Sequence, residues 1–178
     1  MAVTWTTTAP SVTGWSAESI TGEYHYEVTG KGSWYSRIRF SIGRITGTRN
    51  VAIKAVLEGH RATGWVAQSC NATPSIQIGG TWYNGTSQSV TSDGTAWKTI
   101  GTQYAIITGL ANGASVPCKN TRGGTSVSLT NPITAPAFRA KVSGSWKEAA
   151  AVYAKVSGTW KEASAGYAKT SGTWKEIQ

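Results

Sequence analysis

Trp34-Tyr-Ser-Arg-Ile-Arg-Phe-Ser-Ile42 alternates between apolar and polar side chains. Apart from Ser36, the even positions of this stretch are apolar, whereas Arg37 and Arg39 occupy odd positions. A period of two residues is typical of a β-strand that has one face in the core and the other in solvent. We therefore expect a half-buried strand here, with its arginines pointing outward.

The segments on both sides of this strand show the same pattern. The apolar residues of 24–28 and 51–57 recur at every second position. Shorter strand-like segments, each bounded by Gly, Asn, Asp or Pro, are found at 65–68, 75–78, 87–90, 97–100, 104–108 and 126–129. Strands at this spacing predict an all-β fold, with an antiparallel β-sandwich or jelly roll over residues 1–135. Two prolines in 131–136 then interrupt the pattern.

Composition and charge limit the classes of protein. The 178 residues include 17 Lys and Arg against 8 Asp and Glu, a net charge of +9 that attracts anionic surfaces of any kind. The sequence has neither a charged and apolar leader after Met1 nor a run of about 18 apolar residues, so we expect no export signal and no membrane span. Cys70 and Cys118 are too few for a disulfide framework. Their spacing favours two half-buried thiols over a bridge between neighbouring loops.

Three copies of one motif make up the C-terminal segment, residues 136–178. The copies begin at Ala140, Ala154 and Ala168, have a period of 14 residues and share the pattern Ala-Lys-Val/Thr-Ser-Gly-Ser/Thr-Trp-Lys-Glu, the third copy being truncated. Ser-Gly between two short extended runs is typical of a tight hairpin turn. We therefore expect three Trp-bearing β-hairpins.

The turn residues also predict the register of each hairpin. With Ser157 and Gly158 in the turn, Lys155 faces Trp160 and Tyr153 faces Glu162. A single hairpin is marginal in water, so these hairpins need partners, and we favour self-association, as a trimer, over a monomeric meander. The expected contact residues are Trp146, Trp160, Trp174, Lys141, Lys155, Lys169, Tyr153 and Tyr167.

The repeated unit resembles the short Lys-Val-Ser-Gly-x-Trp-Lys repeats at the C-termini of tail, fibre and other minor virion proteins of tailed bacteriophages. The likeness covers residues 140–178, and the N-terminal region is similar only in general style to the β-sandwich modules of phage fibre and decoration proteins. The resemblance implies a structural virion protein made in the host cytoplasm, with other virion proteins as partners and a role in assembly or host attachment. It assigns no catalytic or binding residue, and it leaves open whether the protein belongs to the head, neck or tail.

The sequence contains no recognisable pattern of catalytic residues, so we do not expect an enzyme. Glu18, Glu23, Glu27, Glu58 and Asp93 include no marked pair of catalytic carboxylates and are expected to be exposed near strand ends. Nucleophile, phosphate-loop and dinucleotide motifs are missing from the sequence. We expect no catalytic residues and no cofactor.

Tryptophans, and not histidines, are the candidate binding residues. His25 and His60 lack further ligands at metal spacing, so no metal site is expected. Trp34, Trp65 and Trp97 fit core positions. Tryptophans beside turns suit either a subunit contact or a sugar face, which leaves a carbohydrate-binding adhesin as the alternative function. Its glycan contacts would include Trp82 and Tyr83, the one Trp-Tyr pair.

The outward cations of the predicted sheet have three interpretations. Arg37, Arg39 and Lys54 form a solvated face, a docking surface for an acidic neighbour in a particle, or, least favoured, a nucleic-acid contact. Tyr35 is the only aromatic residue on that side of its strand, which offers little for base stacking.

Overall fold

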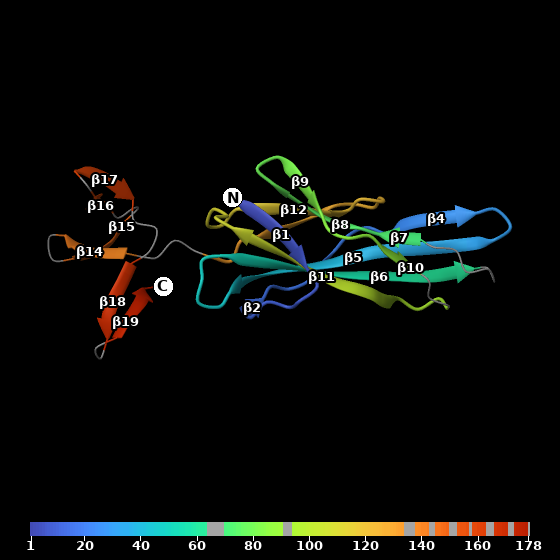
Figure 1. The fold of residues 1–178 in the computed structure, drawn as a ribbon, viewed down its shortest axis with the longest axis horizontal. Coiled ribbons are helices and arrows are strands. Elements are labelled where there is room, and N and C mark those ends of the chain that lie inside the picture. Colours follow the sequence, from blue (N-terminus) through green and yellow to red (C-terminus); the bar gives the residue numbers. More distant parts are fainter. Residues whose placement is uncertain are drawn as a thin grey trace. The chain divides into compact units, whose positions relative to one another are not determined.

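The computed structural model describes residues 1–63, 70–90, 94–133, 138–142, 145–149, 153–156, 158–162, 166–170 and 173–177. Contacts divide the chain into two compact units, Met1–Ile133 and Thr134–Gln178. The division falls inside the segment 131–136, where two prolines interrupt the strand pattern. All regular elements of the described residues are β-strands (Figure 1), so these residues include no helix that could span a membrane.

A seven-stranded antiparallel sheet forms the larger layer of the first unit. In chain order its strands are β1 (Ala2–Thr6), β2 (Val12–Trp15), β3 (Ser19–Ile20), β4 (Tyr24–Val28), β5 (Gly32–Ile45), β6 (Val51–Thr63) and β11 (Lys98–Thr108). The main path is β1-β11-β6-β5-β2, and β3 and β4 also pair with β5. The two long strands β5 and β6 therefore form the centre of this sheet, with Arg37 opposite Glu58 in their register.

A four-stranded antiparallel sheet covers the inner face of the larger one (Figure 1). Its strands are β8 (Pro74–Ile78), β9 (Thr81–Asn84), β12 (Ser115–Asn120) and β13 (Val127–Thr130), in the order β13-β12-β8-β9. A separate pair joins β7 (Cys70–Ala72) to β10 (Gln88–Val90). The fold of this unit is thus an antiparallel sandwich, which confirms the predicted fold class.

The core lies between the two sheets and follows from the alternation in β5. Ile38, Phe40 and Ile42 are at most 1% exposed, and they share one cluster with Ile76 and Val116 of the smaller sheet. Each such side chain contributes about 1.5–3 kcal/mol on burial. Both cysteines are free and buried, so they form no disulfide.

A second, smaller core cluster contains Trp34, Cys70 and Val90, with partly buried side chains of β4 packed against it. Gly59 of β6 lies directly against this cluster, because a Cβ at its position would be 2.3 Å from a methyl carbon of Val90. Trp97, which the sequence placed in the core, is partly exposed and lies outside both clusters.

The second unit consists of three two-stranded hairpins. They pair β14 (Phe138–Val142) with β15 (Ser145–Ala149), β16 (Tyr153–Val156) with β17 (Thr159–Glu162), and β18 (Gly166–Thr170) with β19 (Thr173–Ile177). In each hairpin the lysine of the first strand faces the tryptophan of the second, as the turn residues predict. Gly158, in the middle turn, has a φ of 82°.

Candidate functional site

The outer face of the large sheet carries an ion network. Arg37 Nε donates to Glu58 Oε2 at 2.9 Å, and Arg39 Nε lies 3.0 Å from Glu58 Oε1. Arg39 Nη1 also donates to Glu18 Oε2 at 2.6 Å, and Lys54 Nζ lies 4.0 Å from Glu18 Oε1. The hydrogen bond to Glu18 is the main cause that raises the pKa of Arg39, although burial opposes it. Two carboxylates thus neutralise most of the charge on the three cations.

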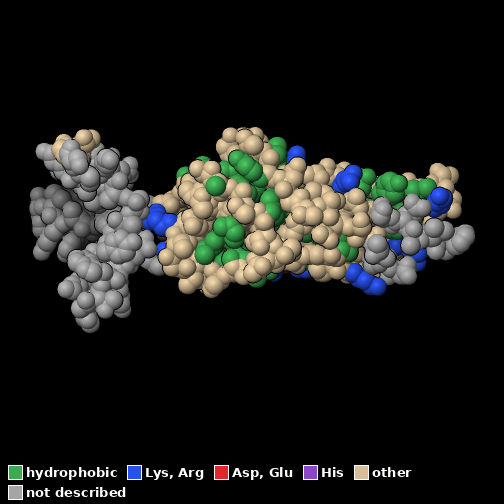
Figure 2. Space-filling model, viewed as in Figure 1, with side chains coloured by type: hydrophobic (Ala, Val, Ile, Leu, Met, Phe, Trp, Pro, Cys, Tyr) green, Lys and Arg blue, Asp and Glu red, His purple; other side chains and the backbone are tan. Residues whose placement is uncertain are grey.

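This network corrects two expectations from the sequence. Arg37, Arg39 and Lys54 do not form a free cationic face, because all three are paired with carboxylates. Glu58 is not an exposed strand-end carboxylate: β6 continues beyond it to Thr63, and Glu58 is only 7% exposed. A buried carboxylate needs compensating charge, which the two arginines of β5 supply. Lysine and arginine side chains are spread over the face drawn in Figure 2 and do not gather in one patch.

A stack of rings continues this outer face. His25, Tyr35 and His60 are direct cross-strand neighbours on β4, β5 and β6, with ring centroids 4.6 and 4.9 Å apart. Trp97 meets the His60 ring edge-on at 4.4 Å, and the Arg37 guanidinium lies 4.0 Å from the Trp97 ring centre. Cross-strand ring pairs of this kind stabilise a sheet.

The ring stack separates the two histidines, because the Tyr35 ring lies between them. They therefore do not converge on one metal position. Across the described ranges, no group of three or more His, Cys, Asp or Glu side chains is placed to hold a metal ion.

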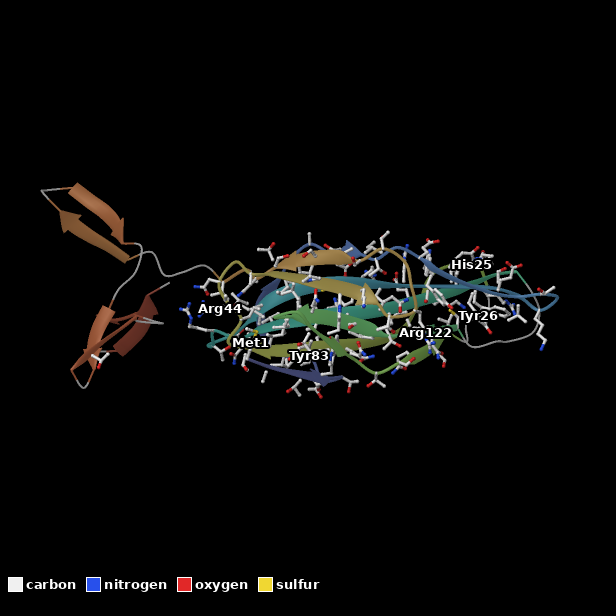
Figure 3. The ribbon with its side chains drawn as sticks, turned by 90° about the horizontal axis from the view of Figure 1, so that it is seen from above. Met1, His25, Tyr26, Arg44, Tyr83 and Arg122 are labelled. Carbon is white, nitrogen blue, oxygen red and sulfur yellow. The ribbon has the colours of Figure 1, made fainter. Side chains whose placement is uncertain are left out.

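A pocket of about 190 Å³ opens between β4, β7 and the turn after β12. Its lining comes from three parts of the fold: Tyr24 and Tyr26 of β4, Cys70 and Asn71 of β7, and Arg122 of the turn after β12. In Figure 3, Tyr26 and Arg122 lie near the same end of the sandwich. We call this the Arg122 pocket.

Backbone hydrogen bonds between connecting segments hold the walls of the Arg122 pocket in place. Thr121 N donates to Thr73 O at 3.0 Å, and Gly22 N donates to Thr125 O at 3.0 Å. Gly124 makes this close approach feasible, because its φ is 82° and a Cβ there would be only 2.2 Å from Gly22 O. The turn that carries Arg122 is therefore fixed to the β3–β4 connection and to Thr73 between β7 and β8 before any ligand arrives.

The electrostatics of the Arg122 pocket are those of an anion site without a nucleophile. Arg122 is exposed and has no carboxylate partner among the described residues. Burial raises the pKa of the Cys70 thiol, while the Arg122 charge opposes the shift, so the thiol stays protonated at neutral pH. The positive charge of the pocket thus comes from Arg122 alone.

A second pocket, of about 300 Å³, is neutral. Trp5, Thr6, Thr7, Thr86 and Gln103 line it. The Gln103 amide is already occupied, since its Oε1 accepts from Thr86 N at 2.8 Å and its Nε2 donates to Thr86 O at 2.6 Å. This pocket offers threonine hydroxyls and an indole ring, but no charge.

The sequence-predicted glycan residues Trp82 and Tyr83 point to opposite faces of β9. Tyr83 pairs with buried Ile76 and packs against the core, whereas the ring of Trp82 is covered by Lys119, whose Nζ lies 3.8 Å from the ring centre. The two aromatic rings therefore form no joint platform.

The eight predicted contact residues of the repeats all lie on the strands of the three hairpins. Lys141 faces Trp146, Lys155 faces Trp160, Lys169 faces Trp174, Tyr153 faces Glu162 and Tyr167 faces Glu176. The contacts of their side chains lie outside the described part of the structure, so their role in an oligomer stays a prediction.

Sequence reasoning missed the Arg122 pocket. The alternation of 24–28 did place Tyr24 and Tyr26 on one face, but Arg122 lies in a turn almost a hundred residues later. No local pattern links these residues. Searches for similar proteins found no match to this chain among family models, curated proteins or solved structures.

Proposed function

We propose that this chain is a non-enzymatic structural component of a tailed-bacteriophage particle that acts in assembly or host attachment. The observation that carries the proposal is the series of three hairpins at a period of 14 residues, each with the same lysine-tryptophan register. The sequence of these hairpins resembles the C-terminal repeats of virion proteins, and their geometry suits association with further copies of the chain.

The hairpins have unpaired strand edges that favour such association. Within the described residues, each hairpin pairs only with itself, so each of its two strands has one free edge. Unpaired edges are ready templates for pairing with another chain, and a lone hairpin is barely stable in water. We therefore infer that residues 136–178 hold copies of the chain together, with a trimer favoured, while the sandwich contacts other virion proteins or the host surface.

Light scattering of a chain that ends at Ile133 tests this role. The shortened chain keeps both core clusters, which lie within Met1–Ile133, so it is expected to fold. We expect an oligomer for the full chain and a monomer for the shortened one. Equal oligomeric states would contradict the proposal.

A point substitution in the full chain gives a matched comparison. Gly158→Val strains the middle hairpin turn, where φ is 82°, and is expected to weaken the oligomer. Gly47→Val imposes a similar strain in the sandwich, where φ is 74° and no atom lies within 4 Å of the added Cβ. It should leave the oligomer intact.

The alternative function, a carbohydrate-binding adhesin, is favoured by the Arg122 pocket, which combines aromatic rings with a hydrogen-bonding side chain. Because the main proposal also includes host attachment, a glycan array distinguishes the two functions only through a comparison of the parent chain with a repeat variant. Saturable binding that Trp160→Ala abolishes, with the oligomer intact, would favour an adhesin that uses its repeat tryptophans.

A further inference from the structure

We propose that the Arg122 pocket binds the carboxylate of an acidic sugar, such as a uronic acid unit of a cell-surface polysaccharide. This ligand would serve the host-attachment part of the proposed function. The inference does not depend on the oligomeric state, so the two ideas are tested separately.

Charge is the first argument for an anionic ligand. Two arginines of the nearby sheet are neutralised, since Arg37 and Arg39 are paired with Glu58 and Glu18. Arg122, in contrast, forms no ion pair with any described residue. A guanidinium binds a carboxylate through two parallel hydrogen bonds, which fixes both distance and orientation.

Aromatic and amide groups are the second argument, because they suit a sugar. Tyr26 is 36% exposed, and its ring lies 6.3 Å from the buried ring of Trp34 in a tilted arrangement. Asn71 Oδ1 accepts a hydrogen bond from the Ser89 hydroxyl at 2.9 Å, which leaves the amide N–H groups of Asn71 as donors for a ligand. An aromatic ring beside a few fixed polar groups is typical of a small-ligand pocket.

Size and charge count argue against larger or more highly charged ligands. The volume of about 190 Å³ is below the roughly 300–1,000 Å³ of pockets for drug-sized ligands, so it has room for one sugar unit or less. Phosphate groups are usually bound by several arginines or by a helix N-terminus, whereas this pocket has a single cation. One carboxylate matches one guanidinium.

Titration of the full chain with galacturonate, followed by NMR, tests the proposal. We expect saturable binding of galacturonate, and binding at least about tenfold weaker for neutral galactose, which lacks the charge. Glutamate and inorganic phosphate serve as probes for an acidic peptide and a phosphate group. Absence of galacturonate binding, equal binding of galactose, or tighter binding of glutamate or phosphate would each overturn the proposal.

Variants locate the binding. Arg122→Gln should weaken galacturonate binding by about tenfold or more, since it removes a charge-assisted pair. Arg49→Gln removes the same charge from the β5–β6 turn, where Arg49 contacts Asn112, and should change binding less than about twofold. An equal effect of both substitutions would show attraction by net charge only and would refute the site.

The tyrosine contribution has its own pair of variants. Tyr26→Phe keeps the ring and should bind galacturonate nearly as well as the parent chain, whereas Tyr26→Ala removes the ring and should bind several-fold more weakly. Tyr26 is exposed, so neither change should unfold the sandwich, which a thermal melt checks. Equal binding by the parent chain and Tyr26→Ala would contradict the proposed stacking on a sugar.

Discussion

Glu58→Gln measures how much the ion network of the outer face stabilises the large sheet. Glutamine keeps the shape of the side chain but removes the charge that Arg37 and Arg39 face at 2.9 and 3.0 Å. Arg39 retains Glu18, whereas Arg37 keeps no other ion pair among the described residues. The substitution therefore leaves one arginine uncompensated in a half-buried position.

The expected cost lies between those of a buried and an exposed pair. Removing one partner of a fully buried pair costs about 3–5 kcal/mol, and an exposed pair contributes about 0–1 kcal/mol. Glu58 has a side chain 9% exposed, but those of Arg37 and Arg39 are 23% and 28% exposed, so water compensates part of the loss. We expect the free energy of unfolding to fall by about 2 kcal/mol. With a urea m-value of about 1–3 kcal/mol/M, the unfolding midpoint should fall by about 1 M.

Urea unfolding followed by tryptophan fluorescence is the assay, with Glu27→Gln as the matched control. The Glu27 side chain is 65% exposed and lies 4.0 Å from His25, so its loss should cost less than about 0.5 kcal/mol. If Glu58→Gln and Glu27→Gln had the same midpoint, the network would contribute nothing measurable and the reasoning would be refuted.

Two further predictions concern the interior. Gly59→Ala should destabilise the fold by about 1–3 kcal/mol through its clash with Val90, and adding Val90→Ala should relieve much of that clash. Urea unfolding measures the effect, with Gly14→Ala as the control because a Cβ at Gly14 meets no atom within 4 Å. Equal unfolding midpoints for Gly59→Ala and Gly14→Ala would contradict the close packing at Gly59. Burial raises the pKa of Cys118 from 9.0 to about 12, so between these pH values the unfolded thiol loses its proton while the folded one keeps it. The free energy of unfolding should therefore fall as pH rises from about 9 to about 12. A thiol reagent at pH 8 should label Cys118 only after unfolding. Rapid labelling of Cys118 in the folded chain would contradict its burial.

Local sequence patterns predict those strands in which apolar and polar residues alternate regularly. The segment 24–28 has the bounds of β4, and the predicted face of 34–42 is the buried face of β5. The segments 97–100 and 104–108 were predicted as separate strands, but most of both belongs to the single strand β11, whose register shifts between Thr99 and Gly101. A bulge of this kind disturbs the period of two and hides the continuity of the strand.

One missed strand shows why proline misleads a local prediction. β12 contains Pro117, which has no N–H to donate, and the sequence predicts no strand there. In the structure Pro117 pairs with Ser128 on one side, while the pairing with β8 on the other side begins only at Cys118. The missing donor is therefore accommodated by the register, which the sequence does not reveal.

The ion network and the Arg122 pocket depend on contacts between distant segments. Arg37 was correctly expected on the outer face, but its pairing with Glu58 depends on the β5–β6 register, and the approach of Glu18 depends on β3 pairing with β5. Likewise, Arg122 and Tyr26 line one pocket because the turn after β12 is bonded to the β3–β4 connection and to Thr73. Such convergence requires the assembled fold.

The hairpins of the second unit make the length of this segment adjustable in evolution. The two strands of each hairpin pair only with each other among the described residues, and the sequence repeats every 14 residues. Duplicating or losing one 14-residue unit in the gene therefore leaves every other ladder unchanged. Recombination between near-identical copies could thus lengthen or shorten the segment in whole steps. The sandwich and its pocket would keep their sequence while the reach of the C-terminal part varied.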